Sequence, residues 1–192
     1  MKGLLELDAE VGVYEHLLTQ AGDIYATINT DVGWAAVGVY NEKPMGGCDK
    51  IPTIIQIKAA LELTVRYCLD TDYMIGVVFE GMMISTIKST FYNFLLTLRA
   101  KYGAQIEPHF VILDTTLDGC VARITARGTK RAKLKLDNIA GKCEIVMRHA
   151  KEYDPSLVSY IKVEETARAD MLPQFLTAVG DVDLLETYIV RS

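Results

Sequence analysis

The chain has 192 residues, of which 50% are hydrophobic and 23% are charged, and its net charge at pH 7 is −5. This composition suits one domain with a sizeable core and argues against a surface that attracts nucleic acid as a whole. No apolar run reaches the roughly 18 residues of a transmembrane helix, and the four cysteines are scattered without C-x-x-C spacing. We therefore expect a cytoplasmic protein with reduced thiols, no membrane segment, and neither a disulfide framework nor a zinc site.

The first half of the chain predicts alternating helices and strands. The first twenty residues predict a short apolar run and then a helix, with Val13, Leu17 and Leu18 on its inner side. Further along, the pattern predicts a strand, a glycine-rich turn, a helix, a strand buried on both faces, and a second helix. These elements cover, in order, residues 35–40, 44–49, 54–68, 74–79 and 87–98.

The second half continues the alternation. Strands are predicted over residues 109–113 and 158–163, and helices over residues 117–126 and 138–151, with a final helical pair over 169–188. Strands that alternate with helices of this length are typical of a parallel sheet covered by helices. We expect one α/β domain over residues 1–192, with three layers and a mainly parallel sheet that carries helices on both faces.

In such sheets, ligands bind beyond the carboxyl ends of the strands. This rule groups three segments around one predicted site: residues 40–49, 80–85 and 114–116. Asp49 and Gly47 in the first segment and Asp114 in the third are therefore candidate substrate-binding residues, although Asp49 could equally cap the helix that follows it.

Glu80 follows a buried strand and precedes Gly81, which lets a ligand approach the backbone closely. A carboxylate in this place could hold Mg²⁺ or accept a proton from an attacking hydroxyl, so Glu80 is a candidate catalytic and metal-binding residue. Ser85 and Lys88 lie just beyond it and are candidate substrate contacts, or alternatively part of a helix start.

The basic segment from Arg123 to Lys135 contains six basic residues and no acidic one. Arg123 and Arg127 are four residues apart on one predicted helix, so their guanidinium groups could together clamp a polyphosphate and stabilise transferring charge. Lys130 and Arg131 are candidate phosphate-binding residues. The alternative is an ordinary solvated helix face.

Three of these patterns together resemble P-loop kinases of nucleosides and nucleotides: Phe79-Glu80-Gly81, Leu113-Asp114-Thr115-Thr116, and the helix from Arg123 to Arg127. With the turn Gly46-Gly47-Cys48-Asp49, they look like a branch common in bacteriophages, some members of which phosphorylate modified pyrimidines such as 5-hydroxymethyluracil in DNA. The resemblance covers residues 35–170. It implies ATP and Mg²⁺ as cofactors, a nucleoside, nucleotide or DNA base as substrate, and a lid-like segment over residues 123–137.

The chain departs from that superfamily in one motif. A phosphate-binding loop reads G-x-x-x-x-G-K-[ST], and its backbone N–H groups and lysine hold the phosphates. No such motif occurs here, and the stretch where it belongs, residues 3–10, is acidic. The absence of this loop predicts impaired catalysis. Three explanations stay open: the loop has been lost, the N-terminus of the sequence is altered, or the chain shares only the fold of these kinases.

Two other functions remain open from the sequence. One is a RuvC or RNase H-like nuclease, in which Asp31, Glu80 and Asp170 would share metal ions and the basic segment would follow a DNA backbone. The other is a non-catalytic pseudo-kinase that binds a nucleotide. Substrate identity and oligomeric state cannot be predicted from these patterns.

Overall fold

The computed structural model describes residues 14–20, 22, 24–30, 32–38, 47–72, 74–81, 85–126, 135–163 and 170–181. Its internal contacts divide the chain into two compact units, residues 1–107 and residues 108–192, which we call unit 1 and unit 2. The single domain expected over residues 1–192 stays a prediction. Among the described residues, no helix is long and apolar enough to span a bilayer.

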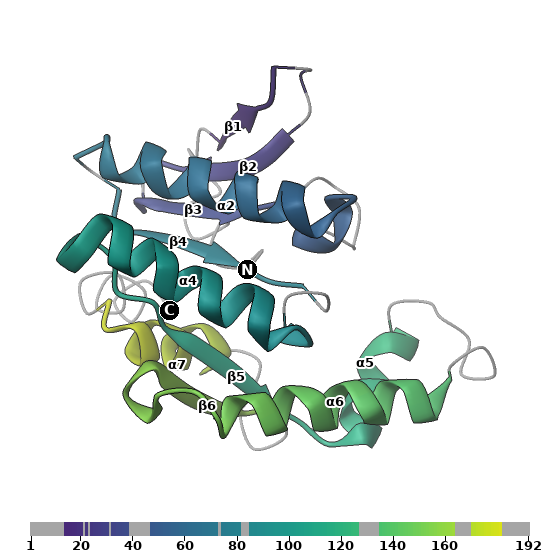
Figure 1. The fold of residues 1–192 in the computed structure, drawn as a ribbon. Coiled ribbons are helices and arrows are strands. Elements are labelled where there is room, and N and C mark those ends of the chain that lie inside the picture. The colour runs from purple at the N-terminus through teal and green to yellow at the C-terminus, as the bar shows by residue number, and fades with distance from the viewer. Residues whose placement is uncertain are drawn as a thin grey trace. The chain divides into compact units, whose positions relative to one another are not determined.

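Unit 1 contains a four-stranded sheet in the order β1-β2-β3-β4 (Figure 1). The strands are β1 (Tyr14–Leu18), β2 (Ile24–Asn29), β3 (Trp34–Val37) and β4 (Gly76–Phe79). Strand β2 is antiparallel to both β1 and β3, whereas β3 and β4 are parallel, with Trp34 opposite Gly76 and Val37 opposite Phe79. All four residues of β3 are buried, so this strand forms the centre of the unit's core.

The helix predicted near the start of the chain is wrong where the structure describes it, because Tyr14–Leu18 forms strand β1. The strand pairs with β2 from Tyr14 to Leu18, and Leu18 is 55% exposed rather than directed inward. A segment of five residues is too short for the spacing of its apolar side chains to distinguish a helix from a strand. Pairing with β2 gives the segment backbone hydrogen bonds along one side and decides between the two structures.

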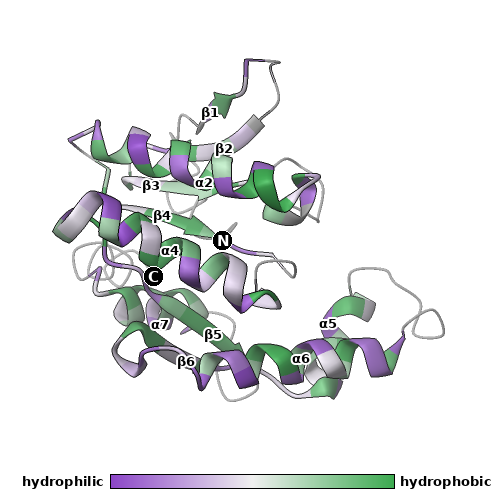
Figure 2. Ribbon diagram, viewed as in Figure 1, coloured by the Kyte–Doolittle hydropathy of each residue, from purple (hydrophilic) through white to green (hydrophobic). Residues whose placement is uncertain are grey.

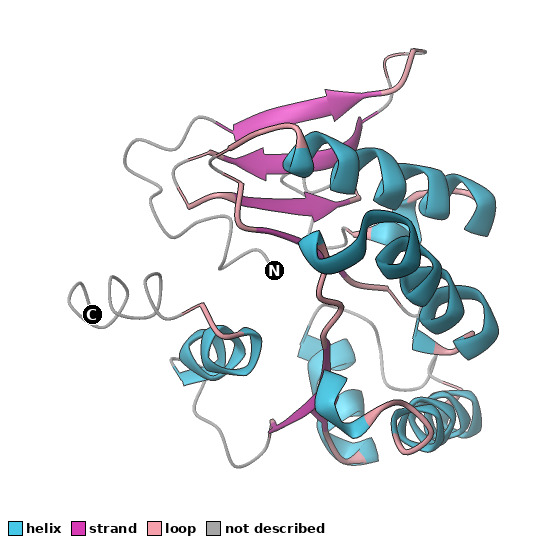
Figure 3. Ribbon diagram, turned by 60° about the vertical axis from the view of Figure 1, so that its left-hand side comes forward, coloured by secondary structure: helices cyan, strands magenta, loops and turns pink. Residues whose placement is uncertain are grey.

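Two helices cover the sheet of unit 1 on one side (Figure 3). Helix α2 (Ile54–Leu69) is capped by the preceding residue, Thr53, whose hydroxyl oxygen accepts a hydrogen bond from the backbone N–H of Gln56 at 3.2 Å. It packs against β2, β3 and β4 and against α4 (Lys88–Tyr102). Short 3-10 turns lie at Cys48–Lys50 and Gly103–Gln105. The two helices confirm the predictions for residues 54–68 and 87–98, and their buried faces comprise Ile57, Ala60, Leu61, Thr64, Val65, Phe91, Leu95 and Leu98.

Unit 2 is built around two parallel strands, β5 (Phe110–Asp114) and β6 (Val158–Lys162), which pair from Phe110 with Val158 to Asp114 with Lys162. Its helices are α5 (Leu117–Ala126), α6 (Leu136–Ala150) and α7 (Met171–Val179), and a 3-10 turn at Pro155–Leu157 precedes β6. Helix α7 packs on both strands, α6 packs on β5, and α5 packs on α6. Strand β5 is hydrophobic along most of its length (Figure 2). These elements confirm the predictions for this half, except that the second member of the final helical pair lies outside the described residues.

The mixture of helices and strands agrees with the predicted α/β class, but the sheet of unit 1 is mixed rather than mainly parallel. Only residues 19–23 and 30–33 separate its first three strands. Connections of this length form hairpins, whereas a parallel pair needs a crossover of a dozen residues or more. The longer stretch that contains α2 provides such a crossover between β3 and β4.

Candidate functional site

In unit 1, Cys48 connects the carboxyl ends of β3 and β4. The backbone N–H of Cys48 donates to the backbone carbonyl of Glu80 at 3.0 Å, and the Cys48 thiol donates to the carbonyl of Val37 at 3.4 Å. Both Gly47 and Cys48 are buried. The structure therefore brings together two of the segments that the strand-end rule grouped, Gly47-Cys48 and Glu80, within one unit.

Gly38 makes this close packing possible. Its φ is 116°, a conformation that side-chain-bearing residues rarely adopt, and a Cβ atom at this position would overlap the backbone of Gly47. The residue directly after β3 must therefore be glycine for the Gly47 segment to reach the end of β4.

Gly38→Ala is expected to destabilise unit 1 by about 3 kcal/mol or more, because the variant combines backbone strain with overpacking against a neighbouring main chain. Urea unfolding followed by the fluorescence of Trp34, the chain's single tryptophan, measures the loss. Gly22→Ala is the matched control, since Gly22 has a φ of 85° but no neighbouring atom within 4 Å, and we expect about 1–2 kcal/mol there. Equal losses in the two variants would contradict the close approach of Gly38 to Gly47.

Glu80 is exposed directly beyond β4. After Gly81, the chain turns at Ser85, whose backbone N–H and hydroxyl both donate to the carbonyl of Gly81, each at 3.2 Å. Lys88 then begins α4, and its ammonium nitrogen lies 6.0 Å from the centre of the Tyr92 ring. Ser85 is thus hydrogen-bonded back to the residue that follows Glu80, while residues 82–84 lie outside the described part of the chain. For Asp49, the structure describes the backbone in a 3-10 turn but not the side chain.

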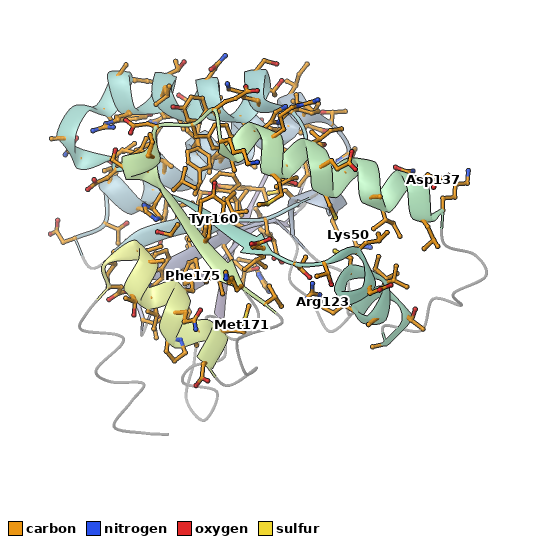
Figure 4. All side chains as sticks on the ribbon, turned by 90° about the horizontal axis from the view of Figure 1, so that it is seen from below. Lys50, Arg123, Asp137, Tyr160, Met171 and Phe175 are labelled. Carbon is orange, nitrogen blue, oxygen red and sulfur yellow. The ribbon has the colours of Figure 1, made fainter. Side chains whose placement is uncertain are left out.

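In unit 2, the carboxyl end of β5 leads into α5 through two threonines. Thr116 caps the helix, since its hydroxyl oxygen accepts the backbone N–H of Gly119 at 3.1 Å. The guanidinium group of Arg123, two turns along α5, donates to the hydroxyl oxygen of Thr115. Arg123 is labelled on α5 in Figure 4. The side chain therefore returns to the end of β5, beside Asp114 in sequence, and is only partly exposed.

The predicted pairing of Arg123 with Arg127 cannot be followed, because Arg127, Lys130 and Arg131 lie outside the described residues. The same holds for Asp31, one of the three acids of the nuclease alternative. Of the other two, Glu80 belongs to unit 1 and Asp170 to unit 2, where it precedes α7 without a hydrogen bond from its side chain to the helix start.

Lys162 is a candidate that the sequence patterns did not identify. It ends β6 directly opposite Asp114, and the backbone N–H of the next residue, Val163, donates to the Asp114 carbonyl at 2.9 Å. The strand 158–163 was predicted, but its pairing with β5 was not. If the two strands had been recognised as parallel neighbours, the exposed Lys162 would have been placed beside Asp114 at their carboxyl ends.

No group of three or more histidine, cysteine, aspartate or glutamate side chains that could hold a metal ion occurs in the part of the chain that the structure describes. A metal ion bound at Glu80 or at Asp114 would therefore have few protein ligands among the described residues. Mg²⁺ suits such a place, because it commonly binds through one or two carboxylates together with water and substrate phosphates.

Comparison with known proteins gives one result. A search of curated proteins and a search of solved structures both returned no match. A scan against protein-family models matched residues 7–166 to the family described as 5-hmdU DNA kinase. The matched range covers most of the chain and includes the strand ends at Glu80 and Asp114 as well as Arg123 and Lys162. The chain therefore belongs to the 5-hmdU DNA kinase family.

Proposed function

We propose that this protein is an ATP-dependent kinase that phosphorylates the hydroxymethyl oxygen of 5-hydroxymethyl-2′-deoxyuridine in DNA. The family match over residues 7–166 is the observation that carries the proposal. In the reaction, the hydroxymethyl oxygen forms a bond to the γ-phosphorus of ATP and loses its proton. The bond from that phosphorus to the bridging oxygen breaks, and ADP leaves.

Within unit 1, we assign the acceptor and metal functions to the turn that follows β4. Glu80 is exposed and would hold Mg²⁺ through one carboxylate, or accept the proton of the hydroxymethyl group. When bound, the metal ion neutralises charge on the phosphates. Gly47, whose segment is hydrogen-bonded to Glu80, would contact substrate through its backbone, and the other proposed substrate contacts in this unit are Asp49, Ser85 and Lys88.

Within unit 2, we assign phosphate binding to the basic groups beyond β5 and β6. Arg123, anchored at Thr115, would stabilise charge on the transferring phosphoryl group, with Arg127 as its partner. Lys162 beside Asp114 would add a further positive charge, and Asp114 would contact the substrate. We propose that residues 123–137 act as a lid in a single kinase-like domain, with Lys130 and Arg131 binding phosphate.

The missing phosphate-binding loop has a consequence for this proposal. Without the backbone N–H groups and lysine of that loop, ATP must be held by fewer contacts, so we expect weak nucleotide binding and slow turnover. The basic side chains of unit 2 would then carry a larger share of the phosphate binding than in kinases that possess the loop.

One set of assays tests the proposal against its alternatives. The full chain is titrated with ATP in a calorimeter with and without Mg²⁺, and it is then incubated with γ-labelled ATP and a duplex that contains 5-hydroxymethyluracil. We expect Mg²⁺-dependent binding and transfer of label to the duplex. Binding without transfer would favour a pseudo-kinase, and nicking of the DNA by metal without ATP would favour a nuclease. Either result would overturn the kinase proposal.

A further inference from the structure

Two cysteines that are far apart in sequence meet in unit 2. The sulfur atoms of Cys120 on α5 and Cys143 on α6 lie 3.6 Å apart, within hydrogen-bonding distance for thiols. Both side chains are partly exposed, so small oxidants can reach them. Cys48 and Cys68, in contrast, lie in unit 1, and Cys48 is fully buried.

The pair lies beside Arg123, the residue to which we assign phosphate binding. Cys120 lies one turn before Arg123 on α5, and Arg123 is near enough to Cys143 to affect its ionisation. Because α5 packs on α6, a covalent link between the two sulfur atoms would hold the helix that carries Arg123 in place.

The ionisation of the thiols sets the conditions for oxidation. Burial, together with the hydrogen bond between the Cys143 and Cys120 thiols, raises the pKa of Cys143, while the positive charge of Arg123 acts in the opposite direction. Since the thiolate is the reactive form, Cys143 is expected to be mostly protonated at neutral pH and to react faster as the pH rises. Burial also raises the pKa of Cys68, to about 11, so this thiol should be unreactive at neutral pH as well.

We propose that Cys120 and Cys143 form a redox-sensitive modification site: in the folded protein, a low-molecular-weight disulfide oxidises them to an intramolecular disulfide that restrains α5 against α6. One cysteine thiolate attacks the sulfur–sulfur bond of the oxidant, which gives a mixed disulfide and releases one small thiol. The second cysteine then attacks the mixed disulfide and releases the other small thiol. The oxidant is reduced to two thiols, the two cysteines are oxidised, and a reducing thiol reverses the reaction.

The experiment treats the full-length folded protein with oxidised glutathione at pH 8.5, blocks the remaining thiols, and maps the peptides by mass spectrometry without reduction. We expect a link between Cys120 and Cys143 that dithiothreitol removes, with Cys48 and Cys68 recovered as blocked thiols. Cys120→Ser and Cys143→Ser should each prevent the link, and Cys68→Ser is the matched control that should leave it unchanged. A protein that keeps four free thiols, or a link that involves Cys68 to the same extent, would overturn the proposal.

The restraint on α5 is measured separately and does not depend on kinase activity. Oxidation should slow amide hydrogen exchange over residues 117–126 by about tenfold or more, because the link removes open states of the helix. The oxidised Cys68→Ser variant should show the same slowing, whereas Cys120→Ser and Cys143→Ser should show none. If either cysteine variant proves unfolded by circular dichroism, the other supplies the comparison. A disulfide that forms with no change in exchange at α5 would overturn the restraint.

Discussion

Arg123→Ala is expected to lower kcat for phosphoryl transfer by about 10²-fold or more, since arginines that stabilise transferring phosphoryl groups contribute effects of this size or larger. The guanidinium group is held at the end of β5 by the hydroxyl oxygen of Thr115, so it is positioned rather than merely solvated. Steady-state kinetics with γ-labelled ATP and DNA that contains 5-hydroxymethyluracil measure the change.

Two further variants sharpen this test. Arg123→Lys keeps the charge but loses the planar fork, so it should recover only part of the activity. Arg148→Ala removes an exposed arginine from α6 of the same unit and should leave kcat within about twofold, because a solvated surface charge contributes little. Equal effects at positions 123 and 148 would show that general positive charge, and not Arg123, supports the reaction.

Glu80→Gln is expected to lower kcat by about 10²-fold or more and to raise the Mg²⁺ concentration needed for half-maximal rate. The substitution keeps the shape of the side chain but removes the charge that would bind the metal and the basic oxygen that would accept a proton. Since the Glu80 side chain is exposed and its backbone carbonyl, not its carboxylate, accepts the hydrogen bond from Cys48, the fold should survive the change.

The control for Glu80 is Glu144→Gln, which removes an exposed carboxylate from α6 and should leave both kcat and the Mg²⁺ requirement unchanged. Thermal unfolding of both variants should match the wild type to within a few degrees, as is usual for exposed positions. If Glu80→Gln retains full activity at low Mg²⁺, Glu80 neither binds the metal nor acts as the base, and Asp114 becomes the next residue to test.

Elements with strong local signals could be predicted from the sequence. Helix α5 begins and ends at the predicted residues because Thr116 caps its first turn and an apolar stripe runs through Val121. Helices α2 and α4 followed from apolar residues spaced three and four apart. Strand β1 could not be identified in this way, because a segment of five residues carries too little periodicity and acquires its structure from pairing with β2.

Features that depend on long-range pairing were the ones missed. The sheet of unit 1 is mixed because hairpins join its first three strands. No single segment of the sequence shows which other strand it will pair with. Lys162 and the Cys120–Cys143 contact each depend on which strands or helices become neighbours in unit 2. The grouping of Gly47 with Glu80 was predictable, because the strand-end rule applies wherever two strands such as β3 and β4 are parallel. The convergence of Glu80, Asp114 and Arg123 on one substrate stays a prediction.

The most direct test of the central claim is to locate the transferred phosphate. A duplex with blocked 5′ ends and one 5-hydroxymethyluracil is incubated with the full chain, ATP and Mg²⁺, then digested by nuclease to nucleoside monophosphates without phosphatase and analysed by mass spectrometry. We expect a modified nucleotide that carries one phosphate group more than the monophosphate of 5-hydroxymethyl-2′-deoxyuridine, and none from a matched duplex with thymine in the same place. Unchanged 5-hydroxymethyl-2′-deoxyuridine at high protein concentration, with the protein folded and ATP intact, would contradict the assignment.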